Sequence, residues 1–268
     1  MRVYAFAVYL FLYIPIGVIA LFSFNAGHHA AQLSGFSLQW YGKTLANPFV
    51  VGAVKTSFTV AITSALLATL FGTLAAVALQ GVRGRWRLVY DALVYVAVMV
   101  PGIVIGIATL IALVTVFDTL NPLLASLFGP ENPIQLGLGK GSLIAAHGLF
   151  TMALVIIIVR ARLQGMDRSL LEASADLGAP PMRSFVQITL PQIAPAVLAG
   201  FLLAFTFSFD DFIIAFFVAG SETTLPIYVF SSIRRGVTPE INVIGTLVLA
   251  ASLLSLITAQ VVLRRRNR

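Results

Sequence analysis

Six apolar stretches run along the chain, separated by shorter polar segments. They are Tyr4–Phe24, Thr56–Leu79, Leu88–Phe117, Ser142–Val159, Ile193–Ala219 and Val243–Leu263. A helix that crosses a bilayer needs about 20 mainly apolar residues. The third stretch is too long for one straight crossing and contains Pro101, so we expect a kink there or a tilted helix. The pattern predicts an all-α, polytopic membrane protein with about six transmembrane helices in one domain, residues 1–268.

Small residues recur along two of these stretches. Gly102 and Gly106 form a G-x-x-x-G pair, and Ala68, Gly72 and Ala76 repeat the same spacing. In lipid, such stripes let helix backbones approach closely. We expect helix–helix seams at both places, either within the chain or between subunits.

Composition supports a membrane protein. The chain is 59% hydrophobic and 10% charged, with a mean hydropathy of +0.98, whereas a soluble domain carries about 25% charged residues. It contains no cysteine, which excludes disulfide frameworks, thiolate zinc sites and cysteine nucleophiles. His28 and His29 are adjacent in a loop without a third ligand nearby, so we expect no metal site.

The basic residues predict the orientation of the spans, because cytoplasmic loops carry an excess of Lys and Arg. With the N-terminus in the cytoplasm, most of the 17 basic residues fall on that side. They are Arg2, Arg83, Arg85, Arg87, Arg160, Arg162, Arg168, Arg183, Arg264, Arg265, Arg266 and Arg268. We therefore expect both termini in the cytoplasm. The net charge of +7 then reports topology, and we expect no nucleic-acid partner.

Residues 160–192 form the one large cytoplasmic loop, and they contain helix signals. Ser169-Leu170-Leu171-Glu172 fits a capping box. The pattern predicts a short cytoplasmic helix from about Leu170 to Leu177, ended by Gly178 in a left-handed conformation. A helix this short is not stable alone in water, so we expect it to pack on something else.

The polar side of this predicted helix is unusual. Arg168, Glu172 and Asp176 follow one another at i, i+4 spacing, which places two acids on one face. One interpretation is a solvated face on which Glu172 acts only as a cap. The other is a surface that meets a partner.

The full string of this loop favours the partner. Glu172-Ala173-Ser174-Ala175-Asp176-Leu177-Gly178 is followed, after nine residues, by Ile188-Thr189-Leu190-Pro191. This resembles the E-A-A-x-x-x-G and I-x-L-P signature of the permeases of ABC importers, with Ser174 in place of the second alanine. The resemblance implies a coupling helix that lies in a groove of a cytoplasmic ATPase subunit. Its ATPase-coupling residues would be Arg168, Glu172, Ala173, Ser174, Asp176 and Gly178.

The chain carries no ATPase motif of its own. No G-x-x-x-x-G-K-[ST] string occurs. The segment 137–142 is only superficially similar, because its glycine spacing is wrong and no Ser or Thr follows the lysine. We expect a non-enzymatic subunit, with ATP and Mg bound and ATP hydrolysed by a partner ATPase, and no cofactor in this chain.

Nearly the whole chain, and its second half most clearly, resembles the spermidine/putrescine importer permeases in particular. Ser208-Phe209-Asp210-Asp211 occupies the place of an S-x-D-D string in that family. Further similar strings are Gly220, Leu225-Pro226, Tyr228, Gly236–Asn242, Tyr13-Ile14-Pro15, Ser23-Phe24-Asn25 and Trp40-Tyr41. The likeness departs around Asn121–Gly141, where this chain has a longer external loop. The resemblance implies a bacterial inner-membrane location, a second permease subunit (a heterodimer partner), two ATPase subunits and an extracytoplasmic binding protein.

Asp210 and Asp211 are the candidate substrate-pathway residues. A carboxylate inside a span costs a few kcal/mol, so it faces protein or a water-filled path. Counting 1.5 Å per residue back from Ala219 along one continuous helix places Asp210 about 13 Å below the outer end. Neighbouring helix positions differ by about 100°, so we expect one carboxylate to line the path and the other to bond a neighbouring helix. In the alternative interpretation, both carboxylates only hold helices together.

Three further polar residues have weaker signals. Glu222 and Glu240 lie on the predicted external side, where a binding protein would dock. Thr238-Pro239-Glu240 also fits an ordinary helix start. We expect His147, in the fourth span, to be a hydrogen-bonded packing residue.

Other functions are less consistent with the sequence. An intramembrane aspartyl protease needs two carboxylates that face each other, but here they are adjacent on one predicted helix. An ion-driven secondary transporter often shows internal repeats, and none is apparent. Within the ABC importers, permeases for ferric iron, thiamine and phosphonates share the coupling loop, so these substrates remain alternatives to a polyamine.

Overall fold

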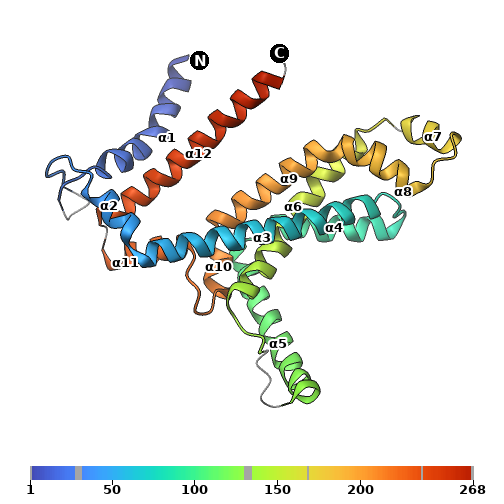
Figure 1. The fold of residues 1–268 in the computed structure, drawn as a ribbon, viewed down its shortest axis with the longest axis horizontal. Helices are drawn as coiled ribbons and strands as arrows, with labels where there is room; N and C mark the ends of the chain where they lie inside the picture. Colours follow the sequence, from blue (N-terminus) through green and yellow to red (C-terminus); the bar gives the residue numbers. More distant parts are fainter. Residues whose placement is uncertain (1, 28–31, 130–134, 168, 237, 267–268) are drawn as a thin grey trace. The chain divides into compact units, whose positions relative to one another are not determined.

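The computed structural model describes residues 2–27, 32–129, 135–167, 169–236 and 238–266, and within these ranges the side chains of residues 4–254. The described residues are almost entirely helical, with one isolated β-bridge between Asn25 and Phe36 (Figure 1). The helices are α1 (Arg2–Phe22), α2 (Gln39–Ala46), α3 (Pro48–Ala78), α4 (Arg85–Met99), α5 (Gly102–Phe128), α6 (Lys140–Gln164), α7 (Ser169–Asp176), α8 (Pro181–Ser184), the π-helical η1 (Phe185–Thr189), α9 (Leu190–Asp210), α10 (Ile213–Val218), α11 (Leu225–Arg235) and α12 (Pro239–Arg266). The predicted all-α class is confirmed.

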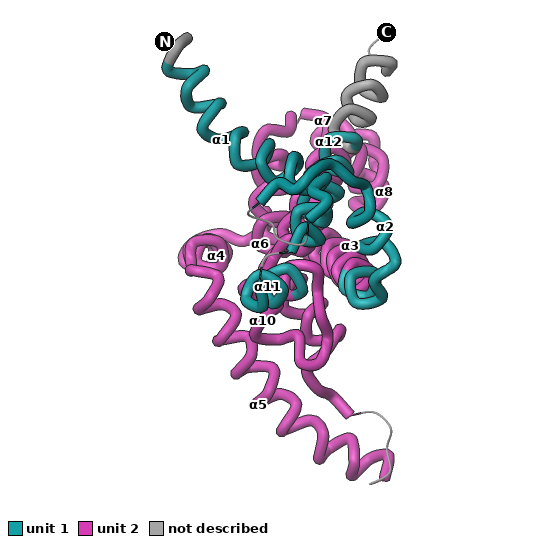
Figure 2. Tube along the Cα trace, turned by 90° about the vertical axis from the view of Figure 1, so that its left-hand side faces the viewer, with its two compact units in different colours: residues 1–53, 228–268 teal, residues 54–227 magenta. Residues whose placement is uncertain are grey.

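The chain forms two compact units (Figure 2). Unit 1 comprises residues 1–53 and 228–268, and in it α12 packs against α1 and α2. Unit 2 comprises residues 54–227, and in it α6 packs against α9, α10 and α4, while α5 packs against α10. Unit 2 contains the candidate coupling helix and both candidate pathway carboxylates.

The predicted spans coincide with apolar helices. Five described helical stretches are long and apolar enough to cross a membrane: Tyr4–Phe22, Pro48–Ala78, Gly102–Phe128, Lys140–Gln164 and Pro181–Asp210. The shorter apolar stretch Pro239–Leu254 lies at the sixth predicted position. A chain with about six apolar membrane helices is therefore confirmed, and the orientation of its termini stays a prediction.

The third predicted span, Leu88–Phe117, is wrong in its bounds. The chain does not kink at Pro101 but breaks there, because Val100 has an extended backbone (φ −68°, ψ 133°). A residue before proline avoids the helical region, so α4 ends and α5 begins anew at Gly102. Helix α5 then continues to Phe128 and takes up the first part of the segment that we expected to be an external loop.

Both small-residue stripes form seams within the chain. A Cβ on Gly72 would lie 3.0 Å from Val155 Cβ of α6, and Ala68 and Ala76 are buried beside it. A Cβ on Gly106 would lie 2.7 Å from a ring carbon of Phe217. Because glycine has no Cβ, these clashes do not arise. Helix α3 can therefore lie close to α6, and α5 can lie close to α10.

Candidate functional site

The short helix that we predicted in the loop 160–192 exists as α7, but it begins one residue earlier than predicted. Ser169 lies in its first turn and therefore does not precede the helix as the capping box required. The amide of Ser169 donates a hydrogen bond of 2.9 Å to Asp167 Oδ1, so Asp167 caps this turn. The same bond holds the pKa of the Asp167 carboxyl below its ordinary value. The predicted site residue Arg168 lies outside the described residues.

The C-terminal end of α7 follows the prediction. Gly178 has a left-handed φ of +74°. Its amide donates to Ala175 O at 2.9 Å, and the amide of Ala179 donates to Ser174 O at 3.1 Å. These two bonds form a Schellman motif, which satisfies carbonyls at a helix end and needs a residue that tolerates positive φ.

Ser174, the departure from the signature, has a partner in the structure. Its side chain is the buried one on α7, and its Oγ lies 2.7 Å from Ser184 Oγ of α8. An alanine at position 174 could not make this bond. The serine therefore fastens α7 to the helix that follows it.

The rest of α7 is open to a partner. Glu172, Ala173 and Asp176 are exposed, and the carboxylates lie on a short helix whose buried side is occupied by its own chain. Leu177 is 88% exposed, and Met182 on the neighbouring α8 is 72% exposed. An apolar surface flanked by acids and lying outside the long apolar helices is typical of a protein contact.

The helical run after α8 contains a π-helical turn before Pro191. The amide of Leu190 bonds to Phe185 O, five residues back. A proline in an ordinary helix clashes with the carbonyl four residues before it and cannot donate to it. The wider π-turn accommodates this, so residues 181–210 form one nearly continuous helical rod that runs from the loop into the membrane.

The fifth predicted span is not one helix, which corrects the argument about Asp210 and Asp211. Helix α9 ends at Asp210, and Asp211 has an extended backbone (φ −67°, ψ 121°). Asp211 Oδ2 accepts the amide of Ala215 at 3.0 Å and so caps α10. The estimated depth of Asp210 and the 100° separation both assumed a continuous helix, so neither holds.

A chain of buried polar groups lies beside this break. Ser64 Oγ of α3 lies 2.9 Å from Ser208 Oγ of α9, which lies 2.8 Å from His147 Nδ1 of α6. His147 Nε2 lies 3.5 Å from Asp211 Oδ2. The prediction that His147 is hydrogen-bonded within the protein is confirmed. Ser64 had no sequence signal beyond being a hydroxyl in an apolar run.

The two carboxylates have different surroundings. Asp211 is half-buried against α10 and His147, whereas Asp210 is exposed on the surface of unit 2. The rings of Phe58, Phe205 and Phe209 pack together near this end of α9, with centroids 4.9–6.1 Å apart. The exposed carboxylate is therefore Asp210, and it directly follows an aromatic cluster.

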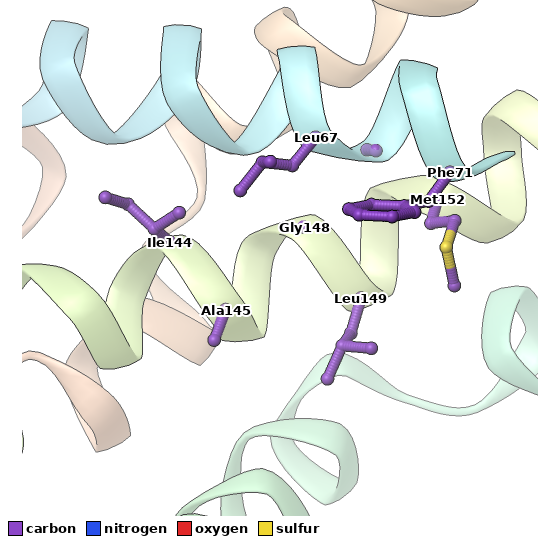
Figure 3. A pocket seen from close by; sticks show the side chains of 8 residues that line it. Leu67, Phe71, Ile144, Ala145, Gly148, Leu149 and Met152 are labelled. Carbon is purple, nitrogen blue, oxygen red and sulfur yellow. The ribbon is translucent and has the colours of Figure 1, made fainter. Parts of the chain in front are cut away.

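An apolar groove lies between α3 and α6 (Figure 3). Leu67 and Phe71 line it from α3, and Ile144, Leu149 and Met152 line it from α6. Its lining carries no charged side chain, so it offers no anionic group that would pair with an ammonium group or bind a metal ion.

Charged contacts near the coupling loop were missed from the sequence. Arg160 of α6 forms an ion pair with Asp91 of α4, and Arg87 lies 3.9 Å from the same carboxylate. Arg162 Nε donates to Gln192 O of α9 at 3.0 Å. An acid within an apolar run, four residues after an arginine, was the available signal for Asp91.

The two glutamates predicted on the external side have partners in their own units. In unit 2, Glu222 lies 3.7 Å from Lys140 Nζ and accepts a bond of 3.4 Å from Thr56 Oγ1. In unit 1, Glu240 accepts a bond of 2.7 Å from Asn47 Nδ2. Contact of either residue with a binding protein stays a prediction.

The longer segment at Asn121–Gly141 is closed by a side chain. Asn121 of α5 accepts the amide of Leu136 at 2.8 Å and donates to its carbonyl at 3.0 Å. This pair of bonds mimics backbone pairing and returns the chain to α5 before α6 begins at Lys140.

Known proteins similar to this chain are bacterial permeases. The chain is 40% identical over 244 residues to the putrescine transport system permease protein PotI of Escherichia coli K12, covering 90% of this chain and 82% of that protein. It is 35% identical over 265 residues to the spermidine/putrescine transport system permease protein PotC of Haemophilus influenzae, covering 98% and 96%.

Solved structures show the same fold. A chain of a bacterial ABC transporter involved in the import of alginate matches with a TM-score of 0.73 at 14% identity, over 99% of this chain and 94% of that one. A chain of the MetNI methionine ABC transporter matches with a TM-score of 0.58 at 17% identity, over 79% and 92%. Residues 68–268 match the family model described as the inner membrane component of binding-protein-dependent transport systems. The chain therefore belongs to the family of inner-membrane components of binding-protein-dependent transport systems.

Proposed function

We propose that this chain is the permease subunit of an ATP-driven importer that carries polyamines such as putrescine and spermidine. The observation that carries the proposal is the similarity to polyamine permeases along almost the whole chain, at 35% identity over 98% of it. Membership of the binding-protein-dependent family makes the chain an inner-membrane permease subunit. That membership removes the ion-driven transporter and the protease as alternatives.

Asp210 is the residue that we assign to the substrate path. Its carboxylate is exposed on unit 2 at the end of α9. An exposed charge within the apolar region cannot face lipid at low cost, so it faces water or another subunit. Polyamines carry protonated amines at neutral pH, and a carboxylate beside aromatic rings suits such cations. Asp211 is already occupied by Ala215 and His147, so it acts inside the chain.

The surface of α7 is the proposed contact with the ATPase. Leu177 and Met182 expose apolar area that a groove in a partner would bury, and Glu172 and Asp176 supply charge beside it. ATP and Mg bind in that partner, which hydrolyses the ATP. The rod 181–210 joins this surface to Asp210, so a displacement of α7 moves the end of α9.

The remaining parts of the importer follow from the charge pattern and the family. The excess of Lys and Arg on the side of α7 supports cytoplasmic termini. A binding protein then delivers substrate at the opposite side, on which the predicted topology puts Glu222 and Glu240. A second, related permease subunit completes the path, with two ATPase subunits below.

Uptake into proteoliposomes that contain the complete importer tests the proposal. We expect ATP-dependent accumulation of labelled putrescine or spermidine. Asp210→Asn should lower the maximal uptake rate by about tenfold, because one charge-assisted contact is worth about 1.5–3 kcal/mol. Asp210→Glu is the matched control and should retain most of the rate, since it keeps the charge. Wild-type uptake by Asp210→Asn would refute the role of this residue.

A further inference from the structure

His147 lies between the two sides of the break in the fifth span. Its Nδ1 lies 2.8 Å from Ser208 on α9, before the break, and its Nε2 lies 3.5 Å from Asp211, after it. The ring is 2% exposed, and Nε2 has no hydrogen-bond partner among the described residues. A buried, polar ring atom aimed at a carboxylate needs a reason beyond packing.

The geometry gives the hydrogen bonds a direction. A neutral imidazole offers one donor and one acceptor. The carboxylate of Asp211 can only accept, so Nε2 carries the hydrogen that faces it. Nδ1 then accepts from the hydroxyl of Ser208, so Ser208 Oγ can only accept from Ser64, whose hydroxyl also reaches Ala61 O at 3.3 Å. Each group in the chain therefore has a defined role, and the ring is fixed from both sides.

Helix α6 also holds the far end of α10. Ser142 Oγ lies 2.7 Å from Val218 O, the last residue of α10. Between the two polar contacts, Leu143 and Ala146 of α6 pack against Ile214 in a buried cluster. The short helix is therefore fastened to α6 near its start and at its end, and His147 is the contact nearest the break.

We propose that His147 is a positioning residue that maintains the break between α9 and α10 and so keeps the Asp210 carboxylate accessible at the end of α9. If α9 continued as a helix, residues 213 and 214 would lie three and four positions after Asp210 and cover it. By bonding Ser208 and facing Asp211, the histidine stabilises the extended backbone that prevents this. The inference rests on the proposed role of Asp210 in the substrate path.

Two variants of His147 distinguish the contact made by Nδ1 from the contact made by Nε2. The amide of His147→Asn occupies the place of Nδ1 and can reach Ser208, whereas the amide of His147→Gln occupies the place of Nε2 and can reach Asp211. If the contact with Asp211 maintains the break, Gln preserves the function of the ring and Asn does not. A purely space-filling role would treat the two amides alike.

This chain has no cysteine, so Asp210→Cys gives it a single thiol, and the modification of this chain reports the accessibility of position 210. The rate of its modification by a charged, water-soluble thiol reagent is measured in the assembled importer. We expect His147→Asn to lower this modification rate by about tenfold, because it loses the contact with Asp211. We expect His147→Gln to stay within about twofold of the rate with His147. A tenfold change in the rate corresponds to about 1.4 kcal/mol. Equal rates in both variants would overturn the positioning role.

The same variants, with Asp210 intact, are assayed for polyamine uptake. Loss of uptake in Asn and its retention in Gln would support the inference through the transport reaction. If the wild-type importer carried no polyamine but the thiol rates still separated the two amides, the proposed substrate would fall and the positioning role would stand. Uptake that is equally impaired in both variants would contradict the role of Nε2.

Discussion

Replacing Gly178 with alanine should weaken the coupling helix without disturbing the rest of the chain. Gly178 has φ +74°, and a Cβ there would meet nothing within 4 Å, so the cost is conformational and not steric. A left-handed alanine costs about 1–2 kcal/mol. Loss of the glycine's freedom in the unordered loop returns about 0.4–1 kcal/mol. The net destabilisation of the end of α7 is therefore about 1 kcal/mol, or about fivefold in the ratio of ordered to unordered loop.

The assay is a binding titration of the partner ATPase against the detergent-solubilised permease. A helix as short as α7 is not stable alone in water, so we expect the ordered loop, the form that binds, to be the minor form in the free permease. The apparent Kd then rises in proportion to the loss of that form, by about fivefold. Gly178→Asn is the matched control, because asparagine tolerates the left-handed region and should recover most of the affinity. An unchanged Kd for alanine, or an asparagine variant as weak as alanine, would refute the reasoning.

Three other substitutions give distinct results. Ser174→Ala removes the bond to the hydroxyl of Ser184 and should weaken ATPase binding by about 1 kcal/mol. Adding Ser184→Ala should weaken it little further. If the losses of the two single variants added up in the double variant, the bond would be contradicted. Gly220→Ala places a Cβ 2.5 Å from the backbone oxygen of Leu138, at a residue with φ +58°. We expect more than about 2 kcal/mol of destabilisation in a thermal unfolding assay. An unchanged unfolding temperature would contradict this and show that the turn adapts. Asp91→Asn removes the ion-pair partner of Arg160 and should cost about 2 kcal/mol in the same assay, while wild-type stability would mean that Arg160 finds another partner.

The coupling loop was predictable because its signals are local. The glycine and the two prolines at 178–181 determine where α7 ends, and the structure shows a Schellman motif there. The predicted cap was wrong by two residues, because the pattern assigned it to Ser169, whereas Asp167 accepts the amide of Ser169. Hydrophobic length alone located the apolar helices.

The break at Asp211 was not predictable by the same means. No proline or glycine interrupts the apolar run around it, so the pattern favoured one continuous helix. The break depends on a side chain that caps α10 and on His147, which comes from a helix about 60 residues away in sequence. Tertiary contacts of this kind leave no periodic signal.

The family-like strings near the N-terminus show a similar limit. Ser23 Oγ lies 2.7 Å from the hydroxyl of Tyr41, Trp40 Nε1 donates to Gly27 O, and Asn25 Oδ1 accepts the amide of Ser34. These residues organise the described parts of the segment between α1 and α2. The sequence marked them as a resemblance, but only the structure supplies their physical role.

The most direct test of the central claim is ATP hydrolysis by the complete importer in proteoliposomes, measured with the binding protein loaded with different solutes. We expect binding protein loaded with putrescine or spermidine to stimulate hydrolysis and to drive uptake of the same polyamine. Stimulation by a binding protein that carries iron, thiamine or a phosphonate, with none by its polyamine-loaded counterpart, would contradict the account.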